Sequence, residues 1–167
     1  MVKSPTDILK EAILLEKRGK AFYSNVAKQS RSAAARKIFN MMAEEEDDHI
    51  KFLAVQFKAY MKDQKFVKPD EHIEPADEDA ALEILTEEVK KEISAASFEA
   101  AAISAAMDFE TRAIKIYSDR AKEASDPLEK KTYQMLADWE SGHHSLLHRL
   151  NEDLKEQVWN DNSFWPF

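Results

Sequence analysis

The sequence contains an internal repeat that aligns without a gap. Residues 16–53 match residues 110–147 at a constant offset of 94, and about a dozen of the 38 positions are identical. Two helices that shared only an amphipathic pattern would keep leucine and alanine in common, not a glutamate, a tyrosine and a Glu-x-x-His pair. The chain is therefore predicted to use one helical hairpin twice. The identical polar positions include Glu16/Glu110, Tyr23/Tyr117, Glu46/Glu140 and His49/His143.

The composition favours an all-α protein with few turns. Only two glycines and five prolines occur in 167 residues, and the helix formers alanine, glutamate, lysine and leucine are abundant. Capping signals place the main helices at 5–29, 32–62, 97–124 and 127–158, and a shorter helix at 80–94. We expect one domain over residues 1–167. It would be a four-helix bundle of two hairpins, joined by a long crossover of about 33 residues between the second and third main helices.

Charge and residue usage exclude several functional classes. A net charge of −8 argues against nonspecific binding to nucleic acid or to an anionic membrane. The chain has no cysteine, which rules out disulfides, thiolate metal ligands and thiol catalysis within it. The first residues lack the apolar core of a signal peptide, and no apolar run approaches the length of a membrane span. A cytoplasmic protein is the simplest expectation.

The repeat puts ionisable residues on the apolar face of each helix. At about 100° per residue, Glu46 and His49 fall on the same stripe as Ile38, Met42 and Leu53. Equivalent positions on the other helices give one inward carboxylate each and a second imidazole. In each hairpin the carboxylates lie about 14 or 15 residues from the turn, so that they come level. The six predicted inward residues are Glu16, Glu46, His49, Glu110, Glu140 and His143.

Four buried carboxylates require a counter-charge, because each unpaired buried ion costs several kcal/mol. Two divalent cations would neutralise four glutamates, and two neutral histidines would complete the ligand set. Oxygen-rich ligation with two imidazoles and no sulfur suits iron or manganese. The sequence thus predicts two metal ions per chain, expected to be iron, with manganese or a mixed pair as the alternative. A bundle with a buried polar network and no metal is the other interpretation.

The sequence resembles the rubrerythrin-type members of the ferritin-like superfamily. The motif E-x-x-G-x-x-F-Y at 16–23, followed by E-x-x-H about thirty residues later, is typical of that group. A glutamate from two helices and Glu-x-x-His from the other two is the ligand pattern of ferritin-like di-metal bundles. The resemblance implies that Glu46 and Glu140 bridge two metals. It also implies that the other four residues, Glu16, His49, Glu110 and His143, are terminal ligands.

The sequence departs from rubrerythrins proper in two ways. It has none of the four cysteines of their rubredoxin-like domain, and alanine stands at position 113, where they carry an extra glutamate one turn after the ligand on the third main helix. The first departure implies a separate electron-donor protein. The second brings the ligand set closer to a ferroxidase centre. We expect a redox protein that reacts with dioxygen or hydrogen peroxide, as a peroxidase or a ferroxidase, in a homodimer or larger homo-oligomer. The alternatives are iron storage in a ferritin-like shell without turnover, and a helical interaction module with a vestigial site.

Three further features lead to expectations beyond the six ligands. Tyr23 and Tyr117 lie on the inward stripes in both hairpins, and we expect their hydroxyls to hydrogen-bond ligand carboxylates; a buried tyrosine of the core is the alternative. Glu45 lies at the edge of its stripe, but its repeat counterpart is Trp139, so the two positions cannot share a role. The aromatic segment at 158–167 is expected to pack on its own bundle or on a neighbouring subunit.

Overall fold

The computed structural model describes residues 4–69, 79–95 and 97–160, and over these residues the chain is helical with no strand. The helices are α1 (Pro5–Gln29), α2 (Ala33–Asp63), α3 (Asp79–Glu92), α4 (Phe98–Glu123) and α5 (Pro127–Asn160). The predicted all-α class and the predicted helices are confirmed, with boundaries that differ by at most two residues. None of these helices is long and apolar enough to span a bilayer.

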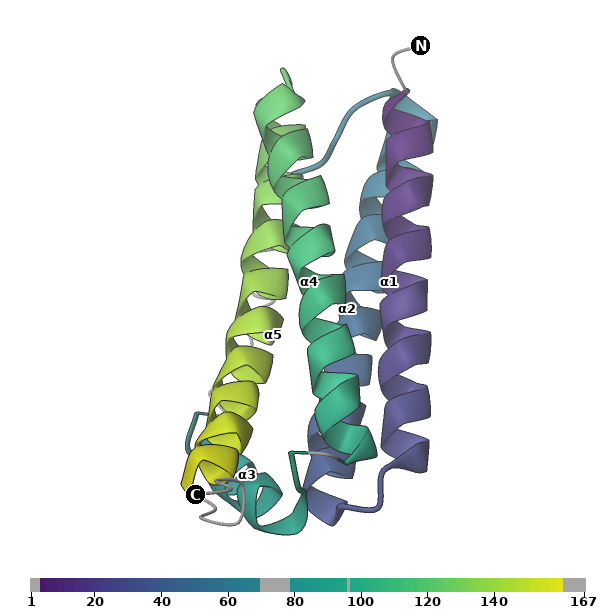
Figure 1. Cartoon of the computed structure of the whole chain (residues 1–167). Coiled ribbons are helices and arrows are strands. Elements are labelled where there is room, and N and C mark those ends of the chain that lie inside the picture. The colour runs from purple at the N-terminus through teal and green to yellow at the C-terminus, as the bar shows by residue number, and fades with distance from the viewer. Residues whose placement is uncertain (1–3, 70–78, 96, 161–167) are drawn as a thin grey trace.

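The four long helices form a bundle of two antiparallel hairpins. Helices α1 and α2 pack along each other, as do α4 and α5, and Figure 1 shows the two hairpins side by side. Helix α2 ends beside the start of α1, whereas α3 lies at the opposite end of the bundle, near the turn between α1 and α2 (Figure 1). The chain therefore passes from one end of the bundle to the other before α4 begins. This arrangement confirms the long crossover predicted for the ferritin-like bundle.

Serine caps begin three of the four long helices. Ser4, Ser32 and Ser97 each accept a hydrogen bond from the backbone N–H three residues on, which satisfies one of the free donors at a helix start. At the start of α5 the Asp126 carboxylate accepts from the N–H of Leu128. Local sequence signals thus fix where each helix begins, and with it the height of every side chain along the bundle.

Two carboxylates from distant segments close the start of α2. Glu99 accepts from the backbone N–H groups of Arg31 and Ser32, and Glu92 accepts from the Ser32 hydroxyl and the N–H of Ala34. Burial opposes the charge on Glu99, but these backbone hydrogen bonds outweigh it and lower the pKa of the carboxyl. These hydrogen bonds join the end of α3 and the start of α4 to the turn between α1 and α2. They therefore help to fix the position of one hairpin along the other.

The apolar core consists of two clusters, one toward each end of the bundle. The turn cluster lies near the α1–α2 turn and includes Val26, Ile38, Phe39, Ile103 and Leu147. The opposite cluster lies toward the α4–α5 turn and includes Leu9, Phe52, Leu53, Tyr117 and Leu136. Between the two clusters lies the level at which the predicted glutamates and histidines occur.

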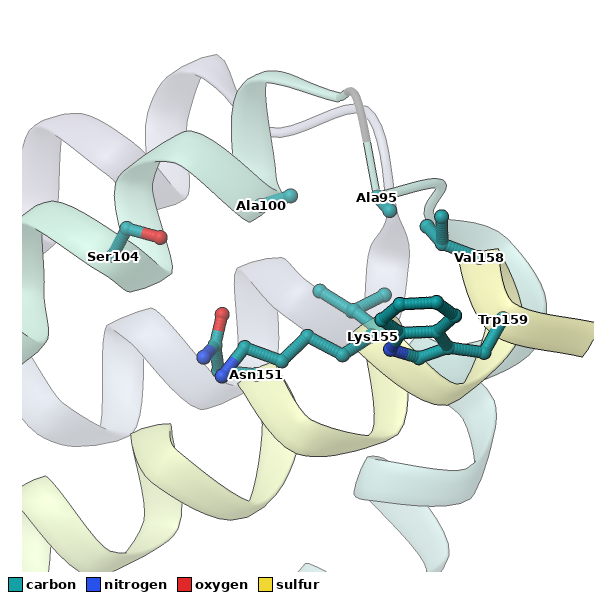
Figure 2. Close-up of a pocket in the computed structure, with 8 residues that line it drawn as sticks. Ala95, Ala100, Ser104, Asn151, Lys155, Val158 and Trp159 are labelled. Atoms are coloured by element: carbon teal, nitrogen blue, oxygen red, sulfur yellow. The ribbon is translucent and has the colours of Figure 1, made fainter. Parts of the chain in front are cut away.

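A surface pocket of about 350 Å³ lies at the end of the bundle, between the start of α4 and the end of α5. Figure 2 shows Trp159, Lys155 and Asn151 on one side of it and Ala100 on the other. Its lining offers no carboxylate and no imidazole, so it is not a second ligand cluster. The predicted packing of the aromatic tail falls mostly on residues 161–167, which lie outside the described part of the chain.

Candidate metal centre

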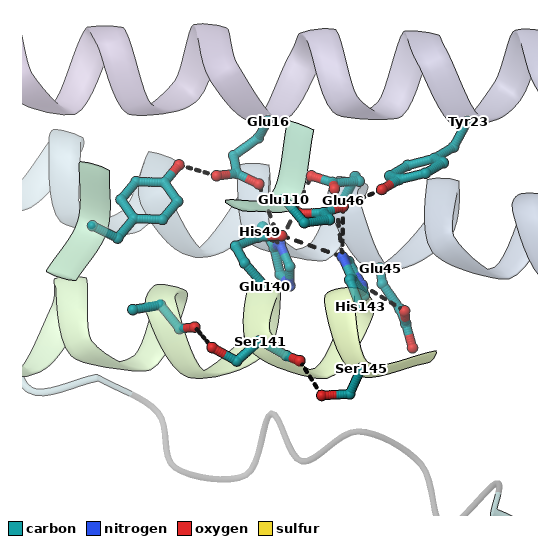
Figure 3. A network of polar contacts seen from close by, with 12 residues as sticks. Glu16, Tyr23, Glu45, Glu46, His49, Glu110, Glu140, Ser141, His143 and Ser145 are labelled. Atoms are coloured by element: carbon teal, nitrogen blue, oxygen red, sulfur yellow. Dashed lines mark hydrogen bonds and ion pairs between the residues drawn. The ribbon is translucent and has the colours of Figure 1, made fainter. Parts of the chain in front are cut away.

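The six predicted residues meet in the middle of the bundle. Every long helix contributes one glutamate, and α2 and α5 each add a histidine one turn later (Figure 3). All six side chains are buried, with no more than 6% of any residue exposed. The helical period turns the six residues inward, and the matched distances from the two turns bring them to one level.

The donor atoms fall into two overlapping groups. The first group is Glu16, Glu46, His49 and Glu140, and the second is Glu46, Glu110, Glu140 and His143. Within each group one donor atom per residue lies within 4.8 Å of all the others. Glu46 and Glu140 belong to both groups, which is the arrangement required of residues that bridge two ions.

Each imidazole directs Nδ1 toward the carboxylates. Nδ1 of His49 lies 3.1 Å from Glu16 Oε2 and 3.1 Å from Glu140 Oε1. Nδ1 of His143 lies 3.2 Å from Glu140 Oε2 and 3.5 Å from Glu110 Oε1. The ring atom that faces the cluster is thus the same in both hairpins, and the repeat in the sequence is also a repeat in side-chain orientation.

The buried carboxylate oxygens are better suited to binding a cation than to hydrogen bonding with other groups in the cluster. No hydrogen bond is formed to either carboxylate oxygen of Glu46 or Glu140, or to Oε2 of Glu110, although the imidazoles make close ion-pair contacts with Glu140. Buried polar atoms in folded proteins are otherwise nearly always paired. Nδ1 of His143 is also without a hydrogen-bond partner. A donor set of oxygen and imidazole nitrogen with free lone pairs is what a divalent metal requires, and the carboxylate–histidine cluster can therefore bind metal.

The pKa shifts express the same crowding of charge. Burial, then the charge of Glu140, raises the pKa of Glu46, and burial raises that of Glu110 to about 7. Burial lowers the pKa of His49, but contacts with Glu140 and Glu16 outweigh it and raise the value to about 9. Burial also opposes the charge of Glu140, yet contacts with His143 and His49 lower its pKa below the ordinary range. The directions of these shifts favour protons within the cluster while no cation is bound.

The two tyrosines cross between the hairpins. The Tyr23 hydroxyl on α1 donates to Glu110 on α4, and the Tyr117 hydroxyl on α4 donates to Glu16 on α1. Burial, reinforced by the neighbouring carboxylates, raises the pKa of both phenols, so that both remain neutral donors at physiological pH. Tyr117 donates to Oε1 of Glu16, whose Oε2 faces His49. Tyr23 donates to Oε1 of Glu110, whose Oε2 has no hydrogen-bond partner.

Gly19 on α1 faces the Glu46 carboxylate with little room for a side chain. A Cβ atom at position 19 would lie 2.9 Å from the Glu46 carboxylate carbon and 2.9 Å from its Oε1. Gly142, the other glycine in the chain, has open space around it, with nothing within 4 Å of such a Cβ atom. The two glycines are both helical but differ in what a methyl group would displace.

We predict opposite outcomes for alanine at these two positions. Gly142→Ala should stabilise the protein by about 1 kcal/mol, because alanine is the better helix former, and should leave metal affinity unchanged. Gly19→Ala has the same propensity gain but pushes the Glu46 carboxylate aside, so metal affinity should fall at least tenfold. Thermal unfolding and zinc titration of both variants check this. Equal metal affinity in the two variants would show that the space beside Gly19 does not matter for metal binding.

Two side chains contact the histidines in a way that the sequence pattern does not predict. Nε2 of His143 lies 2.8 Å from Oε2 of Glu45, which reaches it from α2. The Trp139 indole stacks on His49, with ring centroids 4.9 Å apart and 9° between the planes. The sequence placed Glu45 at the edge of its stripe and paired it with Trp139 in the repeat, but a helical pattern alone does not show which ring each residue touches.

The helical bundle and its buried cluster define a ferritin-like carboxylate protein. A family model described as rubrerythrin matches residues 7–151. The chain belongs to the rubrerythrin family, as the resemblance of its motifs predicted. Comparisons with curated proteins and with solved structures gave no match.

Proposed function

We propose that this protein is a non-haem di-iron redox protein that reacts with dioxygen or hydrogen peroxide, either by reducing peroxide or by oxidising ferrous ion. The supporting observation is the pair of overlapping donor groups that share Glu46 and Glu140, whose four carboxylate oxygens have no hydrogen-bond partner. Two donor groups that share two residues are suited to binding two neighbouring ions. Membership of the rubrerythrin family supports the same conclusion.

Six residues would hold the ions in this proposal. Glu46 and Glu140 would bridge them. Glu16 with His49 would complete one position, and Glu110 with His143 the other. Four carboxylates and two neutral imidazoles balance two divalent cations. When bound, a pair of ferrous ions supplies two electrons to an oxidant, a role that manganese or a mixed pair could also fill.

The surrounding residues position the ligands and keep water out. Tyr23 and Tyr117 donate to Glu110 and Glu16, which fixes the orientation of both terminal carboxylates. The apolar clusters on either side of the centre exclude solvent, which strengthens the electrostatic interactions among the groups inside. The chain thus supplies a rigid donor set.

We propose that a donor outside these 167 residues supplies the electrons, because they hold no cysteine for an iron–sulfur or rubredoxin-like site. We further propose that the protein acts in the cytoplasm as a homodimer or a larger homo-oligomer. No interaction with nucleic acid or with a membrane surface is proposed. Particle size separates this function from iron storage, because a storage shell requires a large closed assembly.

The test is anaerobic loading with ferrous ion followed by reaction with each oxidant. We expect two irons per chain, and absorbance changes upon mixing with dioxygen or with hydrogen peroxide in stopped-flow experiments. Comparison of the two rates identifies the preferred oxidant. Metal analysis that levels off at one or zero ions per chain would contradict the di-metal centre. Two bound irons that react with neither oxidant would contradict the redox function but leave the metal site standing.

Position 113 is predicted to influence oxidant preference. Ala113 is buried one turn after Glu110 on the same face of α4. Rubrerythrins proper carry there a glutamate that can replace a histidine ligand when the irons are oxidised, since ferric ion prefers oxygen. Ala113→Glu should therefore raise the peroxide rate relative to the dioxygen rate. Ala113→Gln adds the same bulk without the charge and serves as the control. An unchanged ratio in a variant that binds two irons would refute this role.

A further inference from the structure

The two histidines have different neighbours on the side that faces away from the cluster. Nε2 of His143 lies 2.8 Å from Oε2 of Glu45, a residue whose side chain is 35% exposed. His49 has the Trp139 ring against its face instead. Figure 3 shows Glu45 beside His143. Because positions 45 and 139 correspond in the repeat, this difference breaks an otherwise two-fold arrangement of glutamates, histidines and tyrosines.

We propose that Glu45 is a positioning residue for His143 that makes the two metal positions inequivalent, so that the first divalent cation binds among Glu46, Glu110, Glu140 and His143. This inference rests on the proposed metal centre and goes beyond it, because the ligand set alone is symmetric. It concerns the order in which the positions fill, and not the reaction that follows.

The hydrogen bond to Glu45 prepares His143 as a ligand. A carboxylate that accepts the Nε2–H keeps the proton on that nitrogen and leaves the lone pair of Nδ1 directed at the cluster. It also fixes the plane of the ring and increases the electron density that the imidazole offers to a metal. Removal of such a partner typically costs 10–100-fold in metal affinity. Since Glu45 reaches His143 from α2, the bond also joins the two hairpins at the centre.

His49 is held differently. Stacking on Trp139 restricts the ring to one plane, but an indole face offers no strong acceptor for an Nε2–H. Within the described residues, no carboxylate is in contact with Nε2 of His49 as Glu45 is with His143. The position formed by Glu16 and His49 therefore lacks the added ligand strength. We expect it to fill second and to release its ion first.

Zinc titration of the metal-free, full-length protein tests this order. Zinc is diamagnetic and redox-inactive, so the two histidines can be followed by ¹⁵N NMR, with signals assigned by His49→Gln. His148→Gln should be present throughout, because His144 and His148 stack as a pair outside the cluster and could bind zinc. We expect His143 to shift with the first equivalent and His49 with the second, and a downfield Nε2–H signal from His143.

Three variants distinguish the hydrogen bond of the Glu45 carboxylate from the effect of its negative charge alone. Glu45→Ala should weaken the tighter binding step 10–100-fold, abolish the downfield signal and remove the preference for His143. Glu45→Gln keeps an acceptor oxygen and should give an intermediate loss. Glu44→Ala removes the same charge from an exposed neighbour on α2 and should change neither the order nor the affinities.

The outcomes distinguish failure of this inference from failure of the metal centre. If the wild type binds two zinc ions but fills the two positions equally, or His49 first, the inference is wrong and the centre stands. The same holds if Glu45→Ala leaves the order and the tighter affinity unchanged. If neither histidine responds to zinc, the proposed metal centre itself is wrong, and this inference falls with it.

Discussion

Replacement of Glu46 and Glu140 together by alanine is expected to abolish the binding of both metal ions. Each of the two donor groups contains four residues, and these two glutamates belong to both groups. The double substitution therefore leaves each position with one glutamate and one histidine. It also removes two of the four negative charges that offset the cations. Elemental analysis and zinc calorimetry should show fewer than 0.1 ions per chain under conditions that give about two in the wild type.

A control variant with the same change in charge makes this result specific. Glu44 and Asp48 are exposed carboxylates on α2 near the ligands. Glu44→Ala, Asp48→Ala removes two negative charges without touching the cluster and should retain both ions. Helical circular dichroism of both double variants checks that the bundle is intact. A Glu46→Ala, Glu140→Ala protein that is folded and still binds two ions would show that the ligands lie elsewhere.

Metal removal is expected to make the stability of the protein depend strongly on pH. The pKa of Glu110 rises from 4.5 to about 7 on folding, chiefly through burial, and the pKa of His49 rises from 6.5 to about 9, where contacts with Glu140 and Glu16 outweigh burial. A raised pKa means that the folded state binds protons more tightly than the unfolded state. The stabilisation is complete below the unfolded value and is lost as pH passes the folded value. The metal-free protein should thus lose stability from about pH 5 to pH 9.

The size of this loss should be several kcal/mol, at about 1.4 kcal/mol per unit of pKa shift. Glu140 acts in the opposite sense. Its pKa is lowered in the folded state, so its contribution to stability is lost only when the pH falls into the acid range. Metal-loaded protein should show no such decline, since cations compete with protons for the same donors and bind better as pH rises. Melting temperatures of metal-free and zinc-loaded protein between pH 6 and 9 test this. A flat curve for the metal-free protein would refute the argument.

The sequence was sufficient to predict the helices and the six cluster residues. The start of each long helix carries a local signal, as Ser32 and Ser97 do, so the boundaries of these helices follow from short-range chemistry. Side-chain direction then follows from the helical period, and relative height from distance to the turn. Because the hairpin occurs twice, every assignment in one half could be checked against the other. For this reason the sequence alone identifies Glu46 and Glu140 as equivalent.

Other contacts depend on packing between hairpins and could not be predicted from one helix at a time. The sequence placed Tyr23 on an inward stripe, but its partner Glu110 lies 87 residues away on the other hairpin. The lack of room for a Cβ atom between position 19 and the Glu46 carboxylate depends on the separation of α1 and α2. The pairing of Glu45 with His143 depends on a side-chain conformation at the edge of the helix face. These contacts depend on helix spacing and on side-chain rotamers, and the helical period of a sequence gives no information about either.

The division of the core into two apolar clusters has a consequence for how the bundle unfolds. The turn cluster and the opposite cluster are separate groups of buried apolar side chains, and the glutamates and histidines lie at the level between them. Ions that bind both hairpins at this level would join the two ends into one cooperative unit. Without them we expect the two ends to open more independently, so that amide hydrogens in the two clusters exchange at separate rates. In this bundle the metal centre would also determine whether the chain unfolds in one step or in two.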